Sequence, residues 1–248
     1  MFDINQQRAY HKAQLYRLLI RLLDNQKIAS NIFFKGGTCS SMLGFLDRFS
    51  VDLDFDLKKG ADKKELREQM HSIFEDLDLT IKDESQKALQ FFLKYQSPSD
   101  QRNTIKLEII DNPFTSIDHK AQYLKDIDRT AICQTLESIF ANKLIALTDR
   151  HKKEGTVAGR DVYDIHYFLS RGFDYKKEII EQRTKKSTLS YLKELRSFID
   201  KKVTEKVINQ DLNFLLPYKR FNSIRKTLKT ETLMLLKDEI KRISEETI

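Results

Sequence analysis

The most distinctive pattern in this 248-residue chain lies in residues 31–57. It begins with an apolar run at residues 32–34, which predicts a short buried strand. Gly36 and Gly37 follow and permit a tight backbone turn, after which Thr38 is suited to cap a helix from residue 39 to about 46. The order of strand, glycine turn, helix and second strand predicts an α/β unit.

The second strand carries aspartates at alternate positions. Apolar residues at 51, 53, 55 and 57 alternate with Asp52, Asp54 and Asp56, so the strand period of two places the two sets on opposite faces. Aspartate is depleted in strands, and carboxylates roughly 7 Å apart on one face repel unless a cation lies between them. Mg²⁺ is such a cation, since it binds one or two carboxylates together with substrate phosphates. A solvated face of an antiparallel strand is the alternative interpretation.

Helix N-termini entered through glycine turns attract phosphate, because their N–H groups lack intrahelical partners. A phosphate-binding turn beside paired carboxylates indicates nucleotidyl transfer. The segment resembles the first motif of the DNA-polymerase-β-like nucleotidyltransferases at Gly36, Gly37, Thr38, Arg48, Ser50, Asp52 and Asp54. Its Gly-Gly-Thr, Arg-x-Ser and Asp-x-Asp-Phe details are similar to the AbiEii/AbiGii group, toxins of type IV toxin–antitoxin systems.

This resemblance implies roles for the matching residues. Asp52 and Asp54 would be the metal-binding acids for two Mg²⁺ ions. The turn residues Gly36, Gly37 and Thr38 would lie near the nucleotide phosphates. Arg48 and Ser50 would brace either the strand or the triphosphate.

The resemblance to this superfamily also implies a third carboxylate on a neighbouring strand. Residues 104–110 alternate and place Lys106, Glu108 and Ile110 on one face, ahead of a turn at 111–113. Glu108 is our candidate, either as a metal ligand or as the base that activates the attacking hydroxyl. Asp111 is the second choice, and an ordinary exposed glutamate paired with a lysine is the alternative.

Two further motifs lie on predicted helices. Residues 134–149 read as an amphipathic helix with Lys143 in its apolar stripe, where a lysine either snorkels outward or has a buried anionic partner. The family resemblance matches Lys143 to a lysine that contacts the nucleotide. A helix from Arg160 onward places Asp161 and Asp164 on one face.

The resemblance extends to this second helix, because the family's last motif is a basic residue followed by Asp-x-x-Asp. It implies that Asp161 is the functional acid and that Asp164 is its close support. The sequence departs from the family at Arg160, where lysine is commoner, and at Ala158, where an arginine often lies. Asp161 could instead complement the dipole at the start of the helix.

Charge is concentrated in the last third of the chain. Residues 1–170 hold 25 basic and 25 acidic side chains, so the 19 basic and 12 acidic side chains of residues 171–248 account for the whole net charge of +7. Tyr191, Tyr218 and Phe221 lie among these basic residues, and such a surface suits RNA. Solvated helix faces and binding of an acidic antitoxin are the alternatives.

These patterns and the family resemblance together predict an α/β (α+β) fold. Residues 1–170 are expected to form a nucleotidyltransferase core, a mixed sheet flanked by helices, with an N-terminal helix at about 5–28. Residues 171–248 are expected to form a basic, mostly helical C-terminal domain. The two cysteines fit a reduced cytoplasm, and the histidines lack the spacing of zinc ligands. No apolar run is long enough for a membrane span, and the first residues do not read as a signal peptide.

We therefore expect a Mg²⁺-dependent enzyme that moves a nucleoside monophosphate from an NTP to RNA. The resemblance to the toxin group implies the 3′ end of tRNA as acceptor, growth inhibition as the result and a cognate antitoxin. One alternative is a nucleotidyltransferase with a small acceptor, of the kind that modifies antibiotics. The other is a non-catalytic RNA- or protein-binding module on the same fold.

Overall fold

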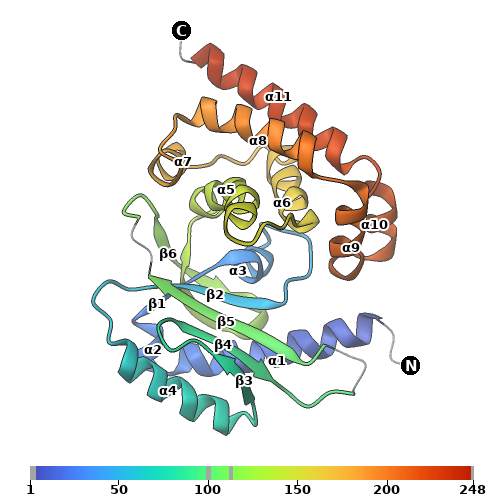
Figure 1. The fold of residues 1–248 in the computed structure, drawn as a ribbon. Helices are drawn as coiled ribbons and strands as arrows, with labels where there is room; N and C mark the ends of the chain where they lie inside the picture. The colour runs from blue at the N-terminus through green and yellow to red at the C-terminus, as the bar shows by residue number, and fades with distance from the viewer. Residues whose placement is uncertain (1–3, 99–101, 112–113, 247–248) are drawn as a thin grey trace. The chain divides into compact units, whose positions relative to one another are not determined.

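The computed structural model describes residues 4–98, 102–111 and 114–246, and the chain divides into two units (Figure 1). The sheet unit comprises residues 1–113 and 119–134, and the helical unit comprises residues 114–118 and 135–248. The division falls after Gln134 and not near residue 170 as the sequence predicted, because helices of residues 136–170 pack among the later helices. Of the predicted turn at 111–113, residues 112 and 113 lie outside the described residues.

The described part of the sheet unit holds a mixed seven-stranded sheet with the order β3-β4-β5-β2-β1-β7-β6. Strand β2 runs parallel to β5 and antiparallel to β1, and β1 runs parallel to β7. Its strands are β1 (Ile32–Lys35), β2 (Asp52–Leu57), β3 (Thr80–Glu84), β4 (Leu89–Lys94), β5 (Thr104–Asp111), β6 (His119–Leu124) and β7 (Arg129–Gln134). Its helices are α1 (Ile4–Asp24), α2 (Gln26–Ala29), α3 (Gly36–Met42), α4 (Lys63–Asp76) and the 3₁₀ turn η1 (Lys125–Ile127).

The alternation of β2 separates a core face from a polar face, as predicted. Leu53 and Phe55 are fully buried, and Phe55 stacks on Phe34 of β1 with ring centroids 5.0 Å apart. Helices α1, α2 and α4 cover one face of the sheet, and α3 lies on the opposite face (Figure 1). The contact between Gly36, at the start of α3, and the Asp54 side chain places the aspartates on the side of α3. Each large apolar side chain buried in this way contributes about 1.5–3 kcal/mol to stability.

Two helix boundaries differ from the sequence prediction. The N-terminal helix does not continue to residue 28, because Asn25 is extended and its side chain accepts a hydrogen bond from the backbone N–H of Ile28, which starts α2. Helix α3 begins at Gly36, so Thr38 lies inside it and does not cap it. The Thr38 hydroxyl instead donates to the backbone carbonyl of Asp52.

The helical unit is arranged around α6, whose residues from Asp161 to Phe168 are all buried. Helices α5, α9 and α11 pack against α6, and Phe140 of α5 stacks on Phe168 at 4.9 Å. A mostly helical C-terminal region is thereby confirmed. The bounds are α5 (Leu136–Glu154), α6 (Gly159–Ser170), α7 (Lys177–Thr184), α8 (Thr188–Lys202), α9 (Glu205–Leu215), α10 (Tyr218–Ile224) and α11 (Leu228–Glu246).

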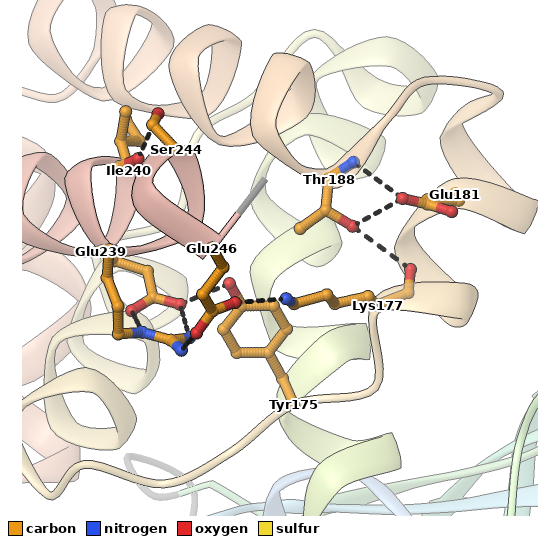
Figure 2. Close-up of polar contacts among 9 residues, drawn as sticks. Tyr175, Lys177, Glu181, Thr188, Glu239, Ile240, Ser244 and Glu246 are labelled. Atoms are coloured by element: carbon orange, nitrogen blue, oxygen red, sulfur yellow. Dashed lines mark hydrogen bonds and ion pairs between the residues drawn. The ribbon is translucent and has the colours of Figure 1, made fainter. Parts of the chain in front are cut away.

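Polar contacts fasten the end of α11 to the segment around α7. The Tyr175 hydroxyl donates to Glu239 at 2.6 Å, and Lys177 reaches Glu246 at 2.9 Å, as Figure 2 shows. Burial and the hydrogen bond to Glu239 raise the pKa of Tyr175.

Among the residues that the structure describes, none of the helices combines the length and apolar character that a membrane crossing requires.

A buried histidine joins α1 to the start of β2. His11 is 1% exposed, with Nε2 3.0 Å from the carbonyl oxygen of Val51 and Nδ1 2.7 Å from the hydroxyl of Tyr95. Burial lowers the pKa of His11 from 6.5 to about 4, although the hydrogen bond to Val51 opposes the shift. His11 is therefore neutral at pH 7 and holds the helix beside the residue that precedes Asp52.

This histidine predicts a pH dependence of folding. The neutral form is favoured in the folded state, so its contribution to stability is complete above pH 6.5 and is lost as the pH falls towards 4. Between pH 7 and pH 5 we expect the free energy of unfolding to drop by about 2 kcal/mol on this account. Urea unfolding at both pH values measures it. In His11→Gln, the decrease in the free energy of unfolding between pH 7 and pH 5 should be smaller by about 2 kcal/mol than in the wild type. An equal decrease in the variant and the wild type would contradict the role given to His11.

Candidate active site

The glycine turn packs directly against strand β2. Gly36 has φ +79°, and a Cβ at this position would overlap Oδ2 of Asp54. A Cβ on Gly37 would lie 2.7 Å from Oγ of Ser50. Together with the hydrogen bond from the Thr38 hydroxyl to the Asp52 carbonyl, these contacts join three consecutive residues, 36–38, to β2 and to Ser50 just before it. Both glycines are therefore required by close approach, and Gly36 also by its backbone conformation.

The side chain of Arg48 packs against Gly37 of this turn. It is 4% exposed, its Nη1 donates to the carbonyl of Phe49 at 3.0 Å, and its Nη2 would lie 3.2 Å from a Cβ on Gly37. Ser50 packs against the same glycine. Of the two roles that the sequence left open for this pair, the positions favour bracing the turn and strand.

Asp52, Asp54 and Glu108 lie on the same face of two neighbouring parallel strands. In the register of β2 and β5, Asp54 is opposite Glu108 and Asp52 is opposite Lys106. Since paired strands are about 4.8 Å apart, Asp54 and Glu108 are direct neighbours across the sheet. The structure thus brings the predicted third carboxylate beside the predicted pair.

Two donors hold Glu108. Lys106 and Gln90 both reach its Oε1, at 2.9 and 2.5 Å. Burial alone raises the pKa of Glu108, but these hydrogen bonds and the positive charge of Lys106 outweigh it, and the pKa is lowered. A carboxylate that is harder to protonate is a weaker base, so this environment favours the role of an anionic ligand over that of a general base.

The third aspartate of β2 has different surroundings. Asp56 is 1% exposed; its Oδ1 lies 2.6 Å from Nζ of Lys35, and its Oδ2 accepts from Gln134 at 2.5 Å and lies 3.1 Å from Nε2 of His119. Burial alone raises the pKa of Asp56, but these three partners lower it to about 2. Asp56 therefore belongs to a closed polar cluster, although the alternation of the strand places it in line with Asp52 and Asp54.

The donors on this face fit Mg²⁺. Asp52 and Asp54 are half-buried carboxylates two residues apart on one strand face, and hard oxygen donors of this kind suit the ion. Within the described ranges, no group of three or more His, Cys, Asp or Glu side chains is arranged around a single metal position. A complete protein cage is not needed, because Mg²⁺ usually keeps water and substrate phosphate among its ligands.

In the helical unit, two ion pairs join α5 to α6. Nζ of Lys143 lies 2.8 Å from Oδ2 of Asp164, which is fully buried, so the lysine has a buried partner and does not snorkel. Nε of Arg150 donates to Oδ2 of Asp161 at 2.9 Å. Asp161 is thus held by an arginine two helical turns beyond Lys143 on α5, and not by the helix dipole alone.

Glycine is also required at the start of α6. A Cβ on Gly159 would lie 2.7 Å from the Cα of Ile208, so α9 crosses this point at close range. The backbone N–H of Gly159 donates to Asp211 of α9 at 2.6 Å, which satisfies one N–H at the N-terminus of α6. The packing of α9 therefore positions the turn of helix that carries Asp161.

Several residues of these clusters were not predicted from the sequence. Arg150 carried a usable signal, because a residue seven positions after Lys143 lies on nearly the same side of a helix. Gln90, Gln134 and His119 carried none. They belong to strands distant from β2 in sequence, and only the sheet order brings them to the carboxylates.

Comparison with known proteins identifies the class. The family described as nucleotidyl transferase AbiEii toxin, type IV TA system, matches residues 17–229. The fold resembles JHP933 from Helicobacter pylori, with a TM-score of 0.59, 19% identity, and coverage of 97% of this chain and 95% of that one. It also resembles MenT4, a nucleotidyltransferase toxin from Mycobacterium tuberculosis, with a TM-score of 0.55, 16% identity, and coverage of 95% and 87%. No curated protein matches the chain.

The protein is therefore an enzyme of the nucleotidyltransferase class. Within that class, the chain belongs to the AbiEii family, the nucleotidyltransferase toxins of type IV toxin–antitoxin systems. The resemblance inferred from the sequence motifs is thereby confirmed, as is the predicted fold class, a mixed sheet with flanking helices.

The contact between Gly36 and Asp54 predicts the effect of a single methyl group. Gly36→Ala should abolish nucleotidyl transfer, because its Cβ overlaps the Asp54 carboxylate and must displace it, and φ +79° adds about 1–2 kcal/mol of strain. Gly44→Ala is the matched control, since Gly44 has φ +75° with nothing within 4 Å of its Cβ position. Activity and melting temperature measure both variants. Equal activity losses would show that the contact with Asp54 is irrelevant.

Proposed function

We propose that this enzyme transfers a nucleoside monophosphate from an NTP to an RNA acceptor in a Mg²⁺-dependent reaction that releases pyrophosphate. The observation that carries the proposal is the carboxylate pair Asp52 and Asp54, held on β2 against the Gly36–Gly37 turn. When bound, two Mg²⁺ ions would supply charge neutralisation for the triphosphate and for the oxygens of the in-line displacement.

The chain's own residues have distinct tasks in this proposal. Asp52 and Asp54 hold the metal ions, and Glu108 adds negative charge beside Asp54 across the strand pair. The backbone of the glycine turn and Thr38 lie near the phosphates. Lys143 contacts the nucleotide, and Asp161 is the functional acid of the Asp-x-x-Asp motif, as the family motifs imply. The ion pairs to Asp164 and Arg150 position these two side chains before substrate binds.

The proposed acceptor is RNA, with the 3′ end of tRNA as the acceptor that the toxin resemblance implies. The family membership also implies a cognate antitoxin. Because NTPs and tRNA are the substrates, we place the reaction in the cytoplasm. Incubation of the protein with total RNA and each α-labelled NTP in turn, with and without Mg²⁺, tests the proposal directly. Label in a small molecule and none in RNA would favour the small-acceptor alternative.

The metal-binding pair predicts the first variants to test. Asp52→Asn and Asp54→Asn should each lower the rate of NMP transfer by at least about a hundredfold and remove toxicity, because a ligand of the metal ions is lost. Asp83→Asn is the control, an exposed aspartate on the edge strand β3. Circular dichroism checks the folds. Unchanged RNA labelling by either site variant would defeat the assignment.

One basic stretch of the helical unit supports the proposal of an RNA acceptor. Residues 212–230 contain no acidic side chain and five basic ones, Lys219, Arg220, Arg225, Lys226 and Lys229. Tyr218, at the start of α10, is 77% exposed and directly precedes two of them. Exposed aromatic rings among basic side chains bind single-stranded nucleic acid by stacking on bases while the cations contact phosphates.

We expect Tyr218→Ala to weaken RNA binding about tenfold, because base stacking on an aromatic ring contributes about 1–3 kcal/mol. Tyr218→Phe should bind nearly as the wild type, since the ring face is kept. Tyr123→Ala is the control, a tyrosine 58% exposed on β6. Fluorescence anisotropy with labelled tRNA measures all three. If Tyr218→Ala and Tyr123→Ala bind equally well, the RNA surface lies elsewhere.

A further inference from the structure

We propose that Asp56 is a positioning residue that keeps the ammonium group of Lys35 away from the metal-binding carboxylates. This inference rests on the proposed function, in which Asp52 and Asp54 bind Mg²⁺. It assigns the third aspartate of β2 a task different from that of the other two, and it makes Lys35 a competitor that the fold restrains.

The strand register places Lys35 next to the metal-binding residues. Lys35 ends β1 and is the Cα partner of Asp54 in the antiparallel pair with β2. Directly opposed side chains in such a pair lie on the same face, with Cβ atoms about 5 Å apart. Asp54 is in turn opposite Glu108 on β5, so three charged residues stand side by side across three strands.

Despite this register, the ammonium group of Lys35 pairs with Asp56. Nζ of Lys35 lies 2.6 Å from Oδ1 of Asp56, and its side chain is only 16% exposed. The partner of Asp56 in the register is Phe33, so the lysine side chain extends diagonally along the strand pair to reach it. The carboxylate of Asp56 therefore draws the lysine away from Asp54, the residue that it faces.

Both oxygens of Asp56 are committed to this task. Oδ1 accepts from Lys35, while Gln134 and His119 of the β6–β7 hairpin hold Oδ2. At 1% exposure the carboxylate has no route to a metal in solvent, which explains why a third aspartate in line with Asp52 and Asp54 need not be a ligand. The β6–β7 hairpin therefore holds the Asp56 carboxylate in place, and Asp56 in turn holds the ammonium group of Lys35.

The consequence of losing Asp56 follows from the cost of an unpaired buried charge. A partly buried ammonium group without its carboxylate takes the nearest anion, and Asp54 and Glu108 are the neighbours on its face. A lysine paired with Asp54 supplies the positive charge that a divalent ion would otherwise supply, so the two compete. Asp56→Asn should thus impair metal binding through Lys35.

Titration with Mn²⁺ alone, followed by the electron paramagnetic resonance signal of the free ion, tests this chain of effects. We expect Asp56→Asn to weaken Mn²⁺ binding about tenfold, within the range of coupling energies measured between contacting residues. The double variant Asp56→Asn/Lys35→Met should return to about the wild-type affinity, because the competing charge is gone. A purely structural role for Asp56 would leave the double variant no better than the single one.

Lys35→Met alone keeps the inference testable if Asp56→Asn does not fold. It should bind Mn²⁺ at least as tightly as the wild type while its melting temperature falls. Weaker Mn²⁺ binding by Lys35→Met, or unchanged binding by a folded Asp56→Asn, would overturn the inference and leave the proposed function standing. A wild-type protein that binds no Mn²⁺ would overturn both.

Discussion

The close approach of the glycine turn to strand β2 is the contact on which the site depends. The turn has no side chain at Gly36 and Gly37, so Asp54 and Ser50 pack directly against its backbone. Thr38 then ties helix α3 to the carbonyl of Asp52. The carboxylates and the N-terminus of helix α3 are therefore held at fixed positions relative to one another. In the proposed function, this contact would set the separation between the bound phosphate and the metal ions.

Four carboxylates on one sheet face would repel one another without neighbouring cations and donors. The fold places a lysine on two of them, Lys35 on Asp56 and Lys106 on Glu108. The same arrangement recurs in the helical unit, where each aspartate of the Asp-x-x-Asp motif has a basic partner on α5. In both units, basic side chains on neighbouring elements thus offset the negative charge of buried or half-buried carboxylates.

Local pattern was sufficient for the elements that carry the motifs. Alternation predicted β2 and β5, a short apolar run predicted β1, and apolar spacing predicted α5 and α6. Strands β3, β4, β6 and β7 were not predicted; of these, β3 and β6 are largely exposed and lack an alternating apolar set. The predicted start of helix α3 was wrong because the side chain expected to cap it has a different hydrogen-bond partner. Thr38 bonds to a distant carbonyl and not to its own helix.

Which side chains share a face could be predicted from the amino-acid order alone, because the strand period of two and the helix period of 3.6 are properties of the local backbone. This order thereby placed Asp52, Asp54 and Asp56 in one row. Only the tertiary structure decided that the third of these is buried and occupied, since its partners come from β1 and from a hairpin more than sixty residues away. Burial and pairing depend on which strands become neighbours, and no local pattern records that choice.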